Sequence, residues 1–167
     1  DLLEREAPKH IDATKAMRME QPATQQDLAC LEGAIKCAAR PIILAGPRFA
    51  SVKGRALLRS FEERTAVPAV VMESPRGLAD PCLGAFAQAL QDADLIVLLS
   101  KPHDFTIRFG QAPFISERAT FFLVEQDDAL IERVRREQGG RLAGLINADA
   151  DCVLSGIAPA LAAAGIS

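Results

Sequence analysis

The chain has 167 residues, of which 49% are hydrophobic and 25% charged, and its formal net charge is -3. This length suits one ordinary domain, and this composition excludes a disordered chain. The near balance of charge gives no reason to expect a nucleic-acid or membrane-surface partner. No apolar run reaches the ~20 residues that cross a bilayer.

The first segment, residues 1–23, is polar and shows no sustained period, so we expect a linker or an extended arm. Its charged start predicts no signal peptide. Thr24, with Asp27 three residues later, then predicts a capping box at the start of a helix. Pro41 disfavours helical geometry in the residue before it, so this helix should end near Arg40. Its apolar stripe consists of Leu28, Leu31, Ile35 and Ala38.

Five short apolar runs alternate with helical segments along the rest of the chain. Such runs suit parallel strands that are buried on both faces, and they comprise residues 41–46, 67–72, 94–100, 120–124 and 142–146. Helices are expected to begin at Ser51, Phe86, Asp127 and Asp151. The alternation predicts an α/β fold with a doubly wound, mainly parallel sheet and helices on both faces, as in Rossmann-like domains.

Glycines and cysteines add smaller expectations. Gly139 and Gly140 tolerate positive φ and should close the helix that begins at Asp127. The chain has no C-x-x-C pair, and neither His10 nor His103 lies near a cysteine, so no zinc site is expected. We expect all four cysteines to be reduced and mostly buried, as in a cytoplasmic protein. They are Cys30, Cys37, Cys82 and Cys152.

In an open parallel sheet, ligands bind beyond the carboxyl ends of the strands, where the strand order reverses. The loop after the first strand is therefore a candidate ligand site, because free N–H groups at the start of the next helix favour the binding of an anion. A dinucleotide fingerprint would place several glycines there, but only Gly46 is present. Pro47 has no N–H to donate, whereas Arg48 brings a charge that binds phosphate. The loop is open to two interpretations, a nucleotide site and a simple turn.

Other strand ends carry polar residues with two interpretations each. Acidic residues there stand where such folds hold a ribose hydroxyl, and they are equally the expected caps of the next helices; they are Glu125, Asp127, Asp128 and Asp149. For Asp127 and Asp151 we favour the cap.

The loop after the third strand offers no clear catalytic arrangement. Ser100, His103 and Asp104 are near neighbours, but nothing places a base on Ser100, and His103 is interpreted as a polar loop residue. A free loop would not carry Phe105, Phe109 and Phe114, so this stretch must pack against something.

The order of these segments resembles the central domain of thiamine-diphosphate-dependent enzymes related to acetolactate synthase, over about residues 24–164. The segments that carry the resemblance are Pro41-Ile42-Ile43-Leu44-Ala45-Gly46, the run from Leu57 through Phe61-Glu62-Glu63-Arg64-Thr65 to Val67-Pro68-Ala69-Val70-Val71, Glu73-Ser74-Pro75-Arg76-Gly77, Ala93-Asp94-Leu95-Ile96-Val97-Leu98-Leu99, Asp104 to Gly110, Phe121 to Asp127 and Leu145 to Asp149.

The resemblance implies a three-domain parent enzyme, a decarboxylase or carboligase of 2-oxo acids that forms homo-oligomers. Its first and third domains would bind thiamine diphosphate and Mg²⁺, using an activating glutamate from the first and a G-D-G motif with an Asn from the third. This sequence contains no G-D-G. We therefore expect residues 1–23 to be the arm from a preceding domain and residues 24–167 to be a central domain that is not catalytic alone.

In some relatives this domain binds FAD, in others ADP, and in many it binds nothing and only scaffolds the oligomer. By position, the resemblance would place Gly46, Arg48, Ser100, Asp104, Arg108, Asp127 and Asp149 around such a site. Pro47-Arg48 replaces the small residues of many binding members, which favours a vestigial or unoccupied site. Two alternatives stay open: an independent ADP- or FAD-binding module of another enzyme, and a protein-interaction domain that uses the three phenylalanines.

Overall fold

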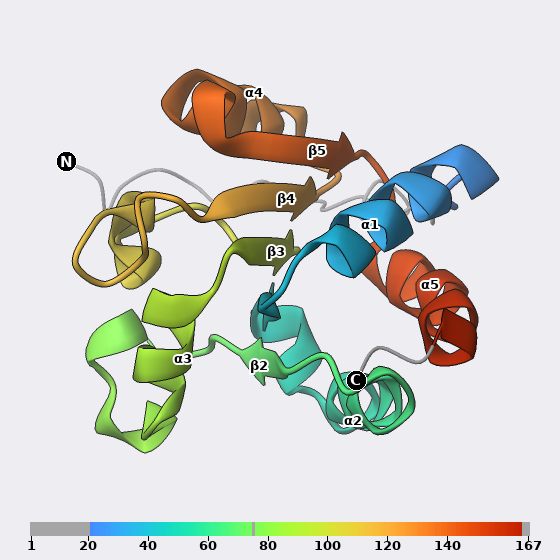
Figure 1. Ribbon diagram of the computed structural model, residues 1–167, viewed down its shortest axis with the longest axis horizontal. Coiled ribbons are helices and arrows are strands. Elements are labelled where there is room, and N and C mark those ends of the chain that lie inside the picture. Colours follow the sequence, from blue (N-terminus) through green and yellow to red (C-terminus); the bar gives the residue numbers. More distant parts are fainter. Residues whose placement is uncertain (1–20, 75, 165–167) are drawn as a thin grey trace, which may run out of the picture.

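A computed structural model of the protein describes residues 21–74 and 76–164. Within them lies one five-stranded sheet with the order β2-β1-β3-β4-β5, in which every neighbouring pair is parallel (Figure 1). The strands are β1 (Pro41–Ala45), β2 (Ala69–Val71), β3 (Leu95–Leu99), β4 (Thr120–Val124) and β5 (Leu142–Ile146). The predicted doubly wound α/β fold is confirmed.

Helices cover both faces of the sheet. On the first face, α5 (Ala150–Ala164) packs against α1 (Gln25–Cys37) and α2 (Val52–Thr65), and Figure 1 shows these three helices together on the right. The second face is covered by α3 (Phe86–Asp92), α4 (Asp128–Gln138) and the 3-10 helix η5 (Phe105–Gly110). The described helices include none that is long and apolar enough to cross a membrane.

The buried strands divide their side chains between two apolar cores. Along β1, Ile43 and Ala45 point into the core beneath α1, α2 and α5, whereas Ile42 and Leu44 point into the other. All five residues of β1 and of β3 are buried. Burial on both faces explains why these strands appear in the sequence as continuous apolar runs and not as alternating ones.

The start of α1 follows the sequence prediction, but its end does not. Thr24 and Asp27 form the predicted capping box. The helix ends at Cys37, before the expected position near Arg40. The N–H groups of Ala39 and Arg40 donate to the Asp94 carboxylate, at 2.7 and 2.9 Å. These two amides therefore bind the residue just before β3 and do not continue the helix.

The second strand, which lies at one edge of the sheet, is shorter than expected. Only Ala69–Val71 pair with β1, and all three are half-buried. The N–H of Ala69 donates to Glu62 Oε1 on α2, at 2.8 Å. A side chain thus accepts an N–H on the outer edge of β2, where the described sheet has no further strand.

Two smaller predictions failed in part or in full. Gly139 closes α4 as predicted, but it does so with φ -48°, in right-handed geometry, because the chain continues into a further 3-10 turn, Gly139–Arg141. The cysteines are not mostly buried, since Cys30, Cys37 and Cys82 are exposed and Cys152 is half-buried. On α1 the buried residues are Leu31 and Ile35, and both cysteines of that helix lie off this stripe.

Candidate functional site

The strand order places a crossover switch between β1 and β3. The chain leaves β1 toward α2 on the first face and leaves β3 toward η5 on the second, and such a point is where doubly wound folds bind ligands. Here the two loops meet through their main chains. The Gly46 N–H donates to Leu99 O at 2.9 Å, and a Cβ on Gly46 would lie 1.8 Å from Ser100 O.

Arg48 is the cation that the sequence suggested as a phosphate ligand. In the structure its charge is paired with two carboxylates of the same chain. Its guanidinium lies 3.4 Å from Asp149 Oδ2 and 3.0 Å from Asp151 Oδ2. Asp149 is 3% exposed. The short 3-10 turn Pro47–Ala50, with proline at its start, aims Arg48 at the beginning of α5. A ligand phosphate would have to compete with two carboxylates for this side chain.

The cap of α5 corrects one prediction. Asp149 Oδ1 accepts the N–H of Asp151 at 2.9 Å, so Asp149 caps the helix and Asp151 lies in its first turn. Asp151 is therefore available to the ion pair with Arg48. Asp149 thus takes the cap, one of its two predicted roles, and the cap that we favoured for Asp151 is wrong.

A cavity of about 570 Å³ lies beside this ion pair, between the beginnings of α2 and α5. Its volume is typical of small-molecule sites, which run from about 300 to 1,000 Å³. Its charges are mixed, because Arg48, Lys53 and the carboxylates of Asp149 and Asp151 all line it. The lining residues are Arg48, Lys53, Leu57, Asp149, Asp151, Cys152 and Ser155.

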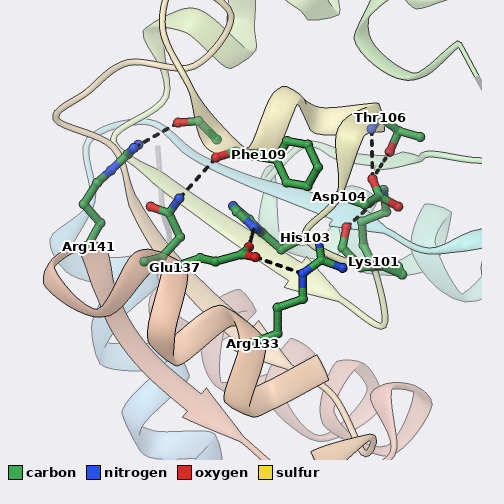
Figure 2. Close-up of polar contacts among 11 residues, drawn as sticks. Lys101, His103, Asp104, Thr106, Phe109, Arg133, Glu137 and Arg141 are labelled. Carbon is green, nitrogen blue, oxygen red and sulfur yellow. Dashed lines mark hydrogen bonds and ion pairs between the residues drawn. The ribbon is translucent and has the colours of Figure 1, made fainter. Parts of the chain in front are cut away.

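The segment after β3 holds a second polar group, drawn in Figure 2. Asp104 Oδ1 accepts from the N–H of Thr106 at 2.9 Å and from Lys101 Nζ at 3.0 Å. Burial lowers the pKa of Lys101, and Asp104 opposes that effect. Burial also favours the protonated form of Asp104, but the hydrogen bonds from Thr106 and Lys101 hold its pKa below the ordinary value. Asp104 thus starts η5 and neutralises a buried lysine.

His103, interpreted from sequence as a polar loop residue, is buried. Its Nδ1 lies 3.1 Å from Glu137 Oε2 on α4 (Figure 2). Its ring meets Phe109 and Phe121 edge-on. Burial lowers the pKa of His103, against the opposing effect of Glu137, so the neutral ring donates Nδ1–H to the carboxylate. Within the described residues, neither His103 Nε2 nor Ser100 Oγ has a hydrogen-bond partner. The pair therefore forms no nucleophile–base contact.

The remaining predicted residues serve separate local roles. Asp127 caps α4 by accepting from the N–H groups of Ala129 and Leu130, as expected. Arg108 is exposed and lies over the Phe114 ring at 4.9 Å. The structure therefore joins Arg48 to Asp149 near Gly46, while Asp104, Arg108 and Asp127 make their contacts elsewhere. In the part of the chain that the structure describes, no three His, Cys, Asp or Glu side chains gather as a metal site.

Arg141 is an organising residue that the sequence did not reveal. Its guanidinium donates to three main-chain oxygens of the β3–β4 segment, at 2.8–2.9 Å, and lies over the Phe121 ring. These acceptors belong to Ala119, Gly110 and Ser116. Main-chain partners leave no signature in residue types, so no sequence signal pointed to it.

Comparison with known proteins gives a likeness of fold. No family model matches the chain, and no curated protein sequence matches it. Among solved structures, the thiamine diphosphate-dependent 4-hydroxybenzoylformate decarboxylase of Rhodococcus jostii RHA1 aligns over 96% of this chain, with a TM-score of 0.61 and 17% identity. A putative thiamin diphosphate-dependent enzyme from Mycobacterium smegmatis aligns over 94%, with a TM-score of 0.59 and 14% identity. This chain spans 30% of each of those two chains. The resemblance to thiamine-diphosphate-dependent enzymes is thereby confirmed at the level of the fold.

Proposed function

We propose that this chain is the central, non-catalytic domain of a thiamine-diphosphate-dependent decarboxylase or carboligase that acts on 2-oxo acids. The observation that carries the proposal is the extent of the fold likeness, which covers 96% of this chain but only 30% of a decarboxylase of that cofactor class. A share of this size is what one of three domains would occupy. The domain's partners would be the two flanking domains and further copies of the same subunit.

The described residues of this chain do not fit the cofactor itself. The resemblance implies that thiamine diphosphate is held through Mg²⁺, and Mg²⁺ requires an octahedral set of oxygen ligands. Neither a G-D-G motif in the sequence nor an acidic cluster among the described residues provides such ligands here. Under the proposal, the cofactor and its metal are therefore bound by the flanking domains.

Three features of the loop after β1 support a scaffold role over tight dinucleotide binding. The loops after β1 and β3 touch main chain to main chain at Gly46, which leaves little room for a pyrophosphate to approach. Arg48 is paired with both Asp149 and Asp151. Pro47 lacks the N–H that a phosphate-binding loop would offer.

The reading frame around the coding segment gives the most direct test. A downstream G-D-G motif followed by an Asn, and an upstream domain with the activating glutamate, are expected. Their absence from both sides would contradict the proposal. A second test adds thiamine diphosphate, Mg²⁺ and benzoylformate or pyruvate to the purified chain, and turnover by the chain alone would also contradict it.

A second candidate function, an ADP- or FAD-binding module, is favoured by the cavity of about 570 Å³ beside Arg48. A thermal-shift series with ADP, FAD, FMN, NAD and coenzyme A separates the candidates. A ligand at 100 times its Kd stabilises by about 2.7 kcal/mol, a shift of roughly 5–11 °C for a domain of this size. A shift that disappears in Arg48→Ala would establish the nucleotide site, and no shift is expected for the scaffold.

A further inference from the structure

The segment from η5 to Phe114 displays large apolar side chains on the surface. Phe105 is 63% exposed, and Phe109 and Phe114 are each 37% exposed. Among the described residues, the only other exposed large hydrophobic side chain is Val52. Three of the four therefore lie within residues 105–114, which is a concentration and not the usual scatter of single surface residues.

The backbone holds this display in an unfavourable conformation. Arg108 and Phe109 have φ values of 52° and 49°, in the left-handed region that residues with a Cβ seldom adopt. Surrounding contacts impose it: Gln138 Nε2 donates to Phe109 O at 3.1 Å, and Arg141 Nη1 donates to Gly110 O at 2.9 Å (Figure 2). Strain that its surroundings enforce is common at binding surfaces.

Two arginines accompany the rings. Arg108 stacks on Phe114 with 4.9 Å between guanidinium and ring centre, and Arg133 lies 5.7 Å from the centre of Phe109. Arg133 is paired with Glu137. Arg108 is exposed, and no described carboxylate forms an ion pair with it. Stacking holds its planar fork in place while leaving its N–H donors for a partner.

We propose that this aromatic–arginine patch, comprising Phe105, Arg108, Phe109, Phe114 and Arg133, docks an acidic protein segment that presents carboxylates beside apolar side chains. Arginine and aromatic residues are the types enriched at the centres of protein interfaces. A guanidinium fork matches a carboxylate in two parallel hydrogen bonds, which gives the charge complement. The inference rests on this surface alone and does not depend on the thiamine-diphosphate assignment.

The test uses a defined probe and an optical property of the chain. The protein contains no Trp and no Tyr, so a single Trp in a synthetic peptide reports binding without background. The probe is a 12-residue peptide of alternating Asp or Glu and Leu with one Trp, and its matched control has Asn and Gln in place of the acids. Trp emission is followed while the full chain is titrated to about 1 mM, so that a Kd up to about that value is detected.

The acidic peptide should bind, and Arg108→Glu and Phe105→Ala should each raise its Kd about tenfold, more than most single truncations at an interface do. Arg59→Ala is the matched control, because Arg59 is exposed on α2, over the opposite face of the sheet, and should leave the Kd within about twofold. Phe105 is mostly exposed, so its variant retains the fold, which circular dichroism verifies.

Four outcomes would overturn the proposal. They are equal binding of the uncharged peptide, an unchanged Kd in Arg108→Glu, no binding at the highest concentration, and a chain that sediments as a dimer through this patch. In the last case Phe105→Ala would restore the monomer, and the occupant would be a second copy of the chain.

Discussion

Gly46→Ala tests the contact on which the description of the crevice depends. The added Cβ would lie 1.8 Å from Ser100 O and 2.7 Å from Ser100 C, both main-chain atoms. Because φ at Gly46 is -73°, alanine suffers no backbone strain there, and the effect is steric alone. The ends of β1 and β3 would have to separate, which disturbs the 2.9 Å hydrogen bond from Gly46 N–H to Leu99 O.

The magnitude follows from known costs of overpacking. Extra methyl groups in a packed interior cost about 1–3 kcal/mol, occasionally more, and a clash with main-chain atoms cannot be relieved by a change of rotamer. We therefore expect Gly46→Ala to lower the free energy of unfolding by at least about 2 kcal/mol. Gly33→Ala is the matched control: Gly33 lies inside α1 with nothing within 4 Å of the added Cβ. It should stabilise the chain by about 0.5–1 kcal/mol.

Urea unfolding followed by far-ultraviolet circular dichroism measures both variants, since the chain has no Trp or Tyr for fluorescence. With a slope of about 1–3 kcal/mol per M of urea, a loss of about 2 kcal/mol should lower the midpoint of Gly46→Ala by roughly 0.7–2 M. A Gly46→Ala protein within about 0.5 kcal/mol of the wild type would refute the close approach of the two loops.

Three further predictions concern the charged groups. In the folded protein the pKa of His103 lies below its ordinary value of 6.5, so the unfolded chain takes up a proton first as the pH falls. The stability of the fold should therefore decrease as the pH drops below about 6.5. His103→Gln should flatten the dependence of Tm on pH between about 5 and 8. Arg48→Ala removes the guanidinium beside the buried Asp149 and should lower the free energy of unfolding by about 1–3 kcal/mol. Asp149→Asn should lower it less in the Arg48→Ala background than in the wild type, and a double-mutant cycle measures the difference. In Arg141→Lys, one ammonium group cannot reach all three carbonyl oxygens, so the free energy of unfolding should fall by about 2 kcal/mol. The segment before β4 should then become the first site of limited proteolysis. Cleavage at the wild-type rate would contradict this role.

The elements of the fold were predictable because burial leaves a local signal. A strand such as β3, buried on both faces, appears as a continuous apolar run, and caps such as Thr24 and Asp127 carry their own residue types. The neighbours of each strand leave no such signal. The order β2-β1-β3-β4-β5 depends on pairings between segments far apart in the chain.

The candidate site was predictable only in part, for a related reason. Position at a strand end identified Gly46, Arg48 and Asp149, which the structure does bring to one edge. The pairing of Arg48 with Asp149 spans 101 residues and depends on where α5 begins. The burial of His103 is likewise decided by α4, which reaches it from 34 residues away.

The closure of the first face by α5 has a consequence for how the protein is made. Both α1 and α2 rest on α5, whose buried residues Val153, Leu154, Ile157 and Leu161 complete that core. A nascent chain that has reached only residue 149 therefore carries an uncovered apolar layer, however much of its sheet has already paired. On the ribosome, that layer stays exposed to chaperones and to other unfinished chains until α5 has been synthesised and has packed on it.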